Sequence, residues 1–252
     1  MKKVHLVALL AGTLMVGCDK EHDPDPYTPP VLPSGGIRLK VTPLWEGAVF
    51  DKFTTYNNVT DYRVQVQLIK LYLSDVHLLT DVGEHHLSDA ELFKLTDGST
   101  YVDLPAPAGN YTGLHFGIGV PDDLNHQDPT QYDANDPLSV SNGMHWTWAD
   151  GYRFVVFDGR FDTIGSGTGV PPELFSIHTG MDTCYRELTF DALPITIATG
   201  GYTQVDIKFD LAKFFYSATD TIDLKTDNQA HGANITLAGR LSDCIAASVG
   251  VQ

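Results

Sequence analysis

The segment Val64-Gln65-Val66-Gln67-Leu68-Ile69-Lys70-Leu71-Tyr72-Leu73 decides the fold class, because apolar and polar residues alternate along its first half. A period of two is typical of a strand with one buried face. Similar runs recur along the chain, separated by turn signals such as Asp97-Gly98 and Gly200-Gly201. They predict further strands at 37–41, 111–120, 152–156, 187–190, 195–197 and 202–210. We therefore predict an all-β protein, a single two-sheet β-sandwich.

Helix is expected to be a minor component, with one turn at 210–215 and a loosely spaced helical pattern at 230–247. Two segments, 121–142 and 159–173, lack a strand pattern and are longer than ordinary hairpin loops. Long loops in compact domains are often functional. We expect both loops at the same end of the sandwich, where they would flank the aromatic stretch that lies between them.

The N-terminal part divides into a leader and a tether. Residues 1–17 have a basic start and a short apolar run, and they end at Leu14-Met15-Val16-Gly17-Cys18. This pattern resembles a bacterial lipoprotein signal with Cys18 as the lipidated residue; the alternative is an ordinary signal peptide with an incidental cysteine. Residues 18–36 are rich in Pro, Asp and Gly and predict a flexible tether before a folded domain at 37–252. The expected location is the cell envelope, with the membrane contacted only through lipid on Cys18.

The net charge of −16 argues against a nucleic-acid partner, which would need basic patches. The chain has three cysteines. With Cys18 lipidated, Cys184 and Cys244 remain as a pair that would form a disulfide in an oxidising compartment. The alternative is that Cys184 is a soft metal ligand.

The most informative stretch for function runs from Gly143 to Phe154, which contains Met144, His145, Trp146 and Trp148. Imidazole together with thioether is a donor set that copper accepts, whereas calcium prefers several oxygen ligands. The ordinary alternatives are that the tryptophans belong to the core and that most of the ten histidines are structural. Among these, His77 and His115 are expected on strands, and His85-His86 in a solvated turn.

Four ordered motifs stand out: Pro107-Ala108-Gly109-Asn110-Tyr111 to Val120-Pro121, Leu124-Asn125-His126-Gln127-Asp128-Pro129, Gly143-Met144-x-Trp146-Thr147-Trp148-x-x-Gly151-Tyr152, and Phe175-x-x-His178-x-Gly180. Together they resemble the MbnP-like family of copper-binding envelope proteins. The resemblance implies a β-sandwich that binds copper, in some members with a kynurenine made from a tryptophan by a di-haem, MauG-like peroxidase. Carried over by motif, it implies His126 and His178 as metal ligands, Met144 as a metal residue nearby, and Trp146 or Trp148 as the modified residue. His145 stands where the family pattern has an aromatic residue, so it is either an extra metal ligand or a residue without a role in the site.

Two functions from different classes follow. The first is a non-catalytic, copper-binding envelope lipoprotein for copper acquisition or storage. The second is a ligand-binding or adhesion sandwich whose aromatic stretch stacks on a sugar or peptide and whose histidines are structural. An enzyme is not expected. Hydrolysis has no supporting motif such as HExxH or an ordered Ser-His-Asp set, and a redox enzyme that uses copper is a third, weaker alternative.

Overall fold

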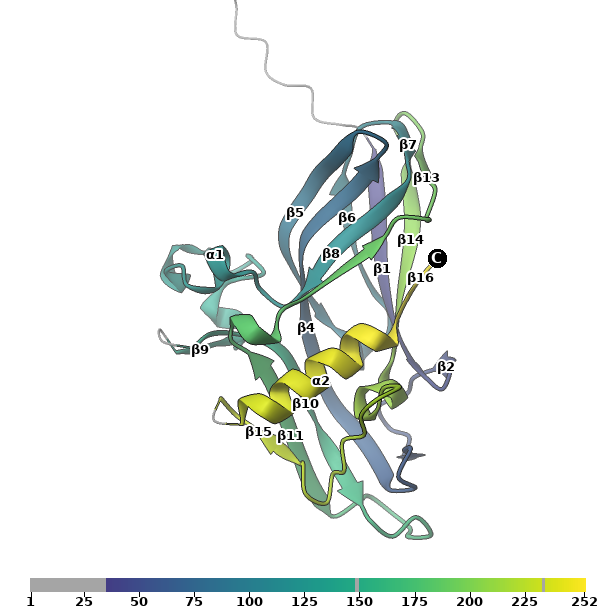
Figure 1. The fold of residues 1–252 in the computed structure, drawn as a ribbon, viewed down its shortest axis with the longest axis vertical. Helices are drawn as coiled ribbons and strands as arrows, with labels where there is room; N and C mark the ends of the chain where they lie inside the picture. The colour runs from purple at the N-terminus through teal and green to yellow at the C-terminus, as the bar shows by residue number, and fades with distance from the viewer. Residues whose placement is uncertain (1–34, 148–149, 233) are drawn as a thin grey trace, which may run out of the picture. The chain divides into compact units, whose positions relative to one another are not determined.

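The strands form two large sheets and a two-stranded ribbon (Figure 1). The structure is a computed structural model and describes residues 35–147, 150–232 and 234–252. The five-stranded sheet contains β1 (Gly36–Trp45), β2 (Ala48–Val49), β6 (Thr100–Pro105), β14 (Tyr202–Asp210) and β16 (Val249–Val251). The nine-stranded sheet contains β3 (Tyr56–Asn57), β4 (Arg63–Thr80), β5 (Gly83–Lys94), β8 (Gly113–Ile118), β9 (His145–Thr147), β10 (Gly151–Asp162), β11 (Glu173–Gly180), β12 (Arg186–Phe190) and β15 (Gln229–Ala230). The ribbon joins β7 (Gly109–Tyr111) to β13 (Ile195–Ile197).

The predicted all-β class is confirmed, and helix is a minor part of the described residues. The helices are α1 (Asp122–Asn125) and α2 (Ile235–Ser248), with short 3-10 turns η1 (Leu95–Asp97), η2 (Pro129–Gln131), η3 (Val140–Asn142), η4 (Asp182–Cys184) and η5 (Leu211–Phe215). Strand β4 lies at the centre of the larger sheet, where it pairs with β3, β5, β8 and β10. It extends the predicted 64–73 strand to 18 residues.

The core is one continuous apolar cluster that takes residues from both sheets. Its aromatic centre contains Phe157 and Phe175 from adjacent strands and Phe214 and Phe215 from η5. The ring centroids of the contacting pairs lie 5.0–5.8 Å apart, and all four side chains are fully buried. Each buried phenyl contributes about 1.5–3 kcal/mol, so η5 is held to the sheet by two strong apolar contacts.

Helix α2, yellow in Figure 1, packs against β11 and η5. It begins where the Asn234 side chain accepts a hydrogen bond from the Leu237 amide at 3.2 Å, as expected for a favourable N-cap. Arg240 then forms ion pairs with Asp220 and Asp227 at 2.6 and 2.7 Å, which tie the helix to the preceding loop. The helical pattern predicted at 230–247 is therefore confirmed, with a later start.

The two long loops do not share one end of the sandwich, and this prediction was wrong. The 121–142 segment lies beside the start of β10, where the hydroxyls of Tyr72 and Tyr152 donate to the carbonyls of Pro137 and Leu138 at 2.8 and 2.7 Å. The other segment follows the end of the same strand, where Arg63 donates to its backbone. The reason is that β10 continues for twelve residues, about 35 Å, and so separates the two loops.

Two further predictions need correction. His85 and His86 lie within β5 rather than in a turn, because strand pairing with β4 continues from Thr80 to Lys70. Cys184 and Cys244 are both buried free thiols, so the predicted disulfide is absent from the described structure. Burial raises the pKa of the Cys244 thiol to about 11, and a side-chain hydrogen bond with Ser217 opposes part of that increase.

The leader at 1–17, Cys18 and the tether up to residue 34 lie outside the described residues. Residues 35–252 fall within one compact unit, apart from the gaps already given. Among the described helices, none is both long enough and apolar enough to cross a membrane.

Candidate metal centre

The first histidine group lies on neighbouring strands and centres on His178 of β11. Its Nε2 lies 2.8 Å from Oδ1 of Asp158 on β10 and 3.2 Å from the hydroxyl of Ser176. The same hydroxyl lies 2.7 Å from Nε2 of His231, in the loop after β15. The two imidazole rings lie 4.7 Å apart, so residues distant in sequence form one cluster.

The charges of this first group are closely coupled. Burial alone would raise the pKa of Asp158, but hydrogen bonds from His178 and Ser176 outweigh it and lower the pKa below its usual value. Burial and the nearby His178 lower the pKa of His231, although Asp158 opposes them. The carboxylate is therefore ionised at neutral pH, and it favours a His178 tautomer that carries a proton on Nε2.

Trp146 lies against this first group. It is on β9, and its ring centroid lies 6.1 Å from that of His178. Gly180 makes the approach possible, because a Cβ at that position would lie only 3.1 Å from the indole ring. The guanidinium of Arg153 lies 5.3 Å from the indole centroid, a cation–π distance. Trp146 is thus packed between a cation and an imidazole.

The second histidine group surrounds His126, the residue that follows α1. Its Nε2 lies 3.0 Å from Asp182 and 3.3 Å from Asp122, and ligand atoms of the three residues lie within 4.8 Å of one another. A hydrogen bond with Asp182 is the main cause that raises the pKa of His126. This group is exposed, which gives an ion direct access to it.

Asn125 connects the second group to the strands. Its side chain is buried, accepts a hydrogen bond from the Tyr152 amide at 2.8 Å and donates one to Asp182 at 2.9 Å. The sequence motif contained Asn125, but pattern reasoning gave it no role. Asp182 and Asp158 were also missed, because a carboxylate that orients a histidine from another strand leaves no local signal.

The sharing of one ion by His126 and His178 stays a prediction. In the parts of the chain that are described, no contact joins His126 to His178. His126 contacts Asp182, and Trp146 packs on Gly180; both contacted residues lie within four positions of His178 in the sequence. Met144 is fully buried in the apolar core, and the His145 ring lies 5.1 Å from that of Tyr152. Trp148 lies outside the described residues.

The donor set at His178 and His231 suits copper chemically. Imidazole binds copper in both of its oxidation states. A carboxylate that accepts a hydrogen bond from one ring nitrogen leaves the other nitrogen with a lone pair that can bind the metal. The His126 group offers one imidazole and two carboxylates, a harder set. Calcium would require more oxygen ligands than either group supplies.

Comparisons with known proteins agree with this fold. Residues 34–236 match the MbnP family. The solved structure of MbnP from Methylosinus trichosporium superposes with a TM-score of 0.52 and 14% identity, covering 85% of this chain and 97% of that one. A search of the curated proteins finds no match. Because the family match spans most of the folded residues, the chain belongs to the MbnP family.

Proposed function

We propose that this protein binds copper in the cell envelope and serves copper acquisition or storage without catalysing a reaction. The observation that carries the proposal is the His178–His231 pair, with Asp158 on one imidazole and Trp146 beside it. Membership of a family associated with copper supports the same reading. The lipid anchor at Cys18 would hold the protein at a membrane surface, where exported copper is encountered.

The residues present have distinct parts in this proposal. His178 is the intrinsic ligand, because Asp158 orients its ring and increases its basicity. His231 supplies the second imidazole that the sequence motifs had placed at His126. Arg153 places a positive charge beside Trp146. This charge repels a metal ion that approaches the indole, so it opposes binding at that side of the site unless a negatively charged group lies nearby.

Copper titration of four proteins tests this assignment. Cu(I) and Cu(II) are titrated against the wild type, His178→Ala, His126→Ala and the matched control His85→Ala, which lies on β5 away from both groups. We expect His178→Ala to weaken binding at least about 100-fold, because even loss of an orienting partner costs 10–100-fold. Equal copper affinity in all four proteins would show that neither histidine group binds copper.

Modification of a tryptophan is a second part of the proposal. We propose that Trp146 or Trp148 becomes kynurenine when a di-haem, MauG-like peroxidase is present. Conversion removes one carbon and adds one oxygen, so tryptic peptides that contain residues 144–152 should change in mass accordingly. Peptides of unchanged mass from cells that produce the peroxidase would exclude the modification. That result would not affect the proposed histidine ligands, which the copper titration tests.

The adhesion alternative has less support from the geometry. Trp146 is half-buried, with Gly180, His178 and Arg153 around its ring. A sugar-binding platform needs an open aromatic face, and these contacts cover much of the indole. Elemental analysis of protein purified from cells separates the two functions, because only the first predicts bound copper.

A further inference from the structure

Three histidines stand directly opposite one another on adjacent strands of the larger sheet, apart from the His178 group. His77 on β4 pairs in register with His86 on β5 and with His115 on β8. The ring centroids lie 5.0 and 6.0 Å from that of His77. Like-charged residues in directly opposed positions destabilise a sheet. A row of three imidazoles is therefore tolerated only with neutral rings, which are also the form that binds a metal ion.

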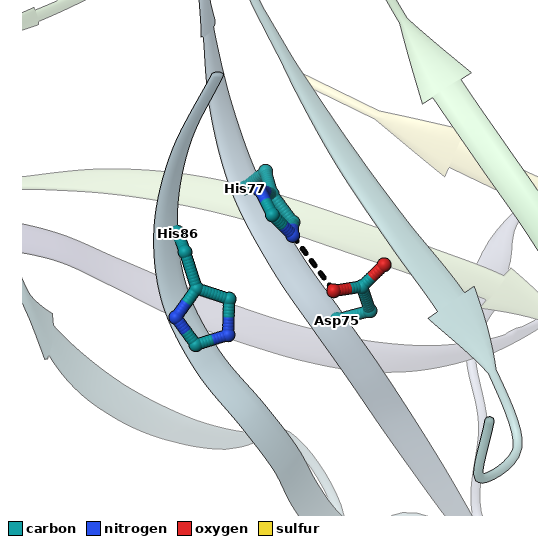
Figure 2. Close-up of side chains that lie close together, drawn as sticks. All are labelled: Asp75, His77 and His86. Carbon is teal, nitrogen blue, oxygen red and sulfur yellow. Dashed lines mark hydrogen bonds and ion pairs between the residues drawn. The ribbon is translucent and has the colours of Figure 1, made fainter. Parts of the chain in front are cut away.

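An irregularity in β4 places a carboxylate within this row. Asp75 adopts a φ of +50°, which is uncommon for a residue other than glycine. The register with β5 shifts between Val76 and His77, and the register with β8 shifts between Ser74 and His77. Such bulges re-aim side chains and are frequent next to functional sites. Here the result is that Oδ1 of Asp75 lies 2.7 Å from Nε2 of His77 (Figure 2).

The ring nitrogens of His77 and His86 differ in whether an acidic side chain lies close to them. Nδ1 of His77 is buried without a hydrogen bond, and its nearest recorded acid is Glu84 at 3.5 Å. Nε2 of His86 lies 3.1 Å from Asp89, which leaves the other nitrogen of that ring available. The His77 side chain is only 17% exposed, whereas that of His86 is 46% exposed, so one face of the row is open to solvent.

We propose that Asp75, His77 and His86 form a binding site for Zn²⁺, separate from the copper site. One ligand atom from each of the three residues lies within 4.8 Å of the others, and Figure 2 shows the three side chains directed toward one another. Two imidazoles and a carboxylate are a usual zinc donor set and leave a fourth tetrahedral position for water. Asp75 itself offers a ligand atom here, whereas Asp158 orients His178, so this donor set is harder than that of the His178 group.

The second group that shares Asp75 explains how the ion could be retained. Ligand atoms of Asp75, His115 and Glu187 also lie within 4.8 Å of one another. His115 is held by Thr189 on the neighbouring strand β12, at 2.9 Å from its Nδ1. Asp75 is therefore the residue around which ligands from four strands gather, and the surrounding carboxylates offset the charge of a divalent ion.

Zinc titration of the full-length chain tests the site. Calorimetry with Zn²⁺ is run on the wild type, His77→Ala, His86→Ala and His85→Ala, the last being the adjacent histidine on the opposite face of the same strand. We expect one tight site that the His77 and His86 changes weaken at least about 100-fold. We expect no change in His85→Ala. His178→Ala is measured as a fifth protein and should also be unchanged, so the outcome does not depend on the copper proposal.

Cobalt spectroscopy keeps the test decisive if a variant is unstable. Co²⁺ in a tetrahedral N₂O₂ site of two imidazoles, one carboxylate and one water should give visible d–d absorption, and Zn²⁺ should displace it. The exposed His86 can be changed to Gln with little effect on folding, which far-ultraviolet circular dichroism verifies. Zinc affinity that is unaltered in both His77→Ala and His86→Gln, or lost equally in His85→Ala, would overturn the proposal.

Discussion

Replacing Asn125 by alanine should destabilise the protein more than any polar change on its surface. Asn125 is 1% exposed and joins three segments, since it lies in α1, accepts from the Tyr152 amide on β10 and donates to Asp182 after β11. No neighbouring side chain replaces both bonds in the described structure. The change therefore removes a connection between elements rather than a single local contact.

The magnitude follows from what each lost bond leaves behind. The Tyr152 amide would stay buried without a partner, which costs about 1–3 kcal/mol. Asp182 is 46% exposed, so water can replace the second bond at a cost of about 1 kcal/mol or less. We expect a loss of about 2–4 kcal/mol in the free energy of unfolding, or about 5–12 °C in Tm for a domain of this size.

Urea denaturation followed by fluorescence measures this loss, with Asn110→Ala as the matched control. Asn110 is exposed and accepts one hydrogen bond, from Thr196 at 2.9 Å, so its replacement should change stability by about 0.5 kcal/mol or less. An Asn125→Ala variant that loses no more than the control would show that the Tyr152 amide finds another partner, and the reasoning would fail.

Further predictions concern the backbone and the acid range. Gly151→Ala should cost about 1–3 kcal/mol in thermal unfolding, because φ is +70° and a Cβ would lie 2.2 Å from Oδ1 of Asn125. Gly239→Ala, within α2 and in open space, should instead stabilise by about 0.5–1 kcal/mol. Arg240→Met should cost about 1 kcal/mol at pH 7. Since Arg240 lowers the pKa of Asp220, that stabilisation is fully present above about pH 4 and is lost as the pH falls through the lowered pKa, so the difference between wild type and variant should shrink progressively in denaturation below about pH 4.

The fold class could be predicted because most strands keep a period of two over several residues. The sequence did not show which side chains of β4 point into the core, because the buried positions switch from even to odd residue numbers and back again along the strand. Val64 and Val66 are buried, then Ile69 and Leu71, and after the bulge Val76. Each irregularity adds a residue and turns the following side chains to the opposite face. A bulge depends on pairing with neighbouring strands, and no local pattern in 63–80 marks it.

The candidate copper site was predictable in part, for a similar reason. His178 and Trp146 stood in motifs, and the structure brings their rings to 6.1 Å. His231 carries no pattern of its own, since it reaches His178 only because β15 pairs with β11 at Ser176. Parallel pairing between segments more than fifty residues apart cannot be inferred from either segment alone.

The histidine row on β4, β5 and β8 extends this argument to chemistry. Taken one at a time, His77, His86 and His115 are ordinary polar residues on strands or in a turn, and each invites a structural interpretation. Register changes that conclusion, because it places three imidazoles opposite one another and a bulge adds Asp75 to them. Stability alone would favour a Thr or Val at such strand positions. Neutral imidazoles, by contrast, present the lone pairs that a bound divalent cation requires.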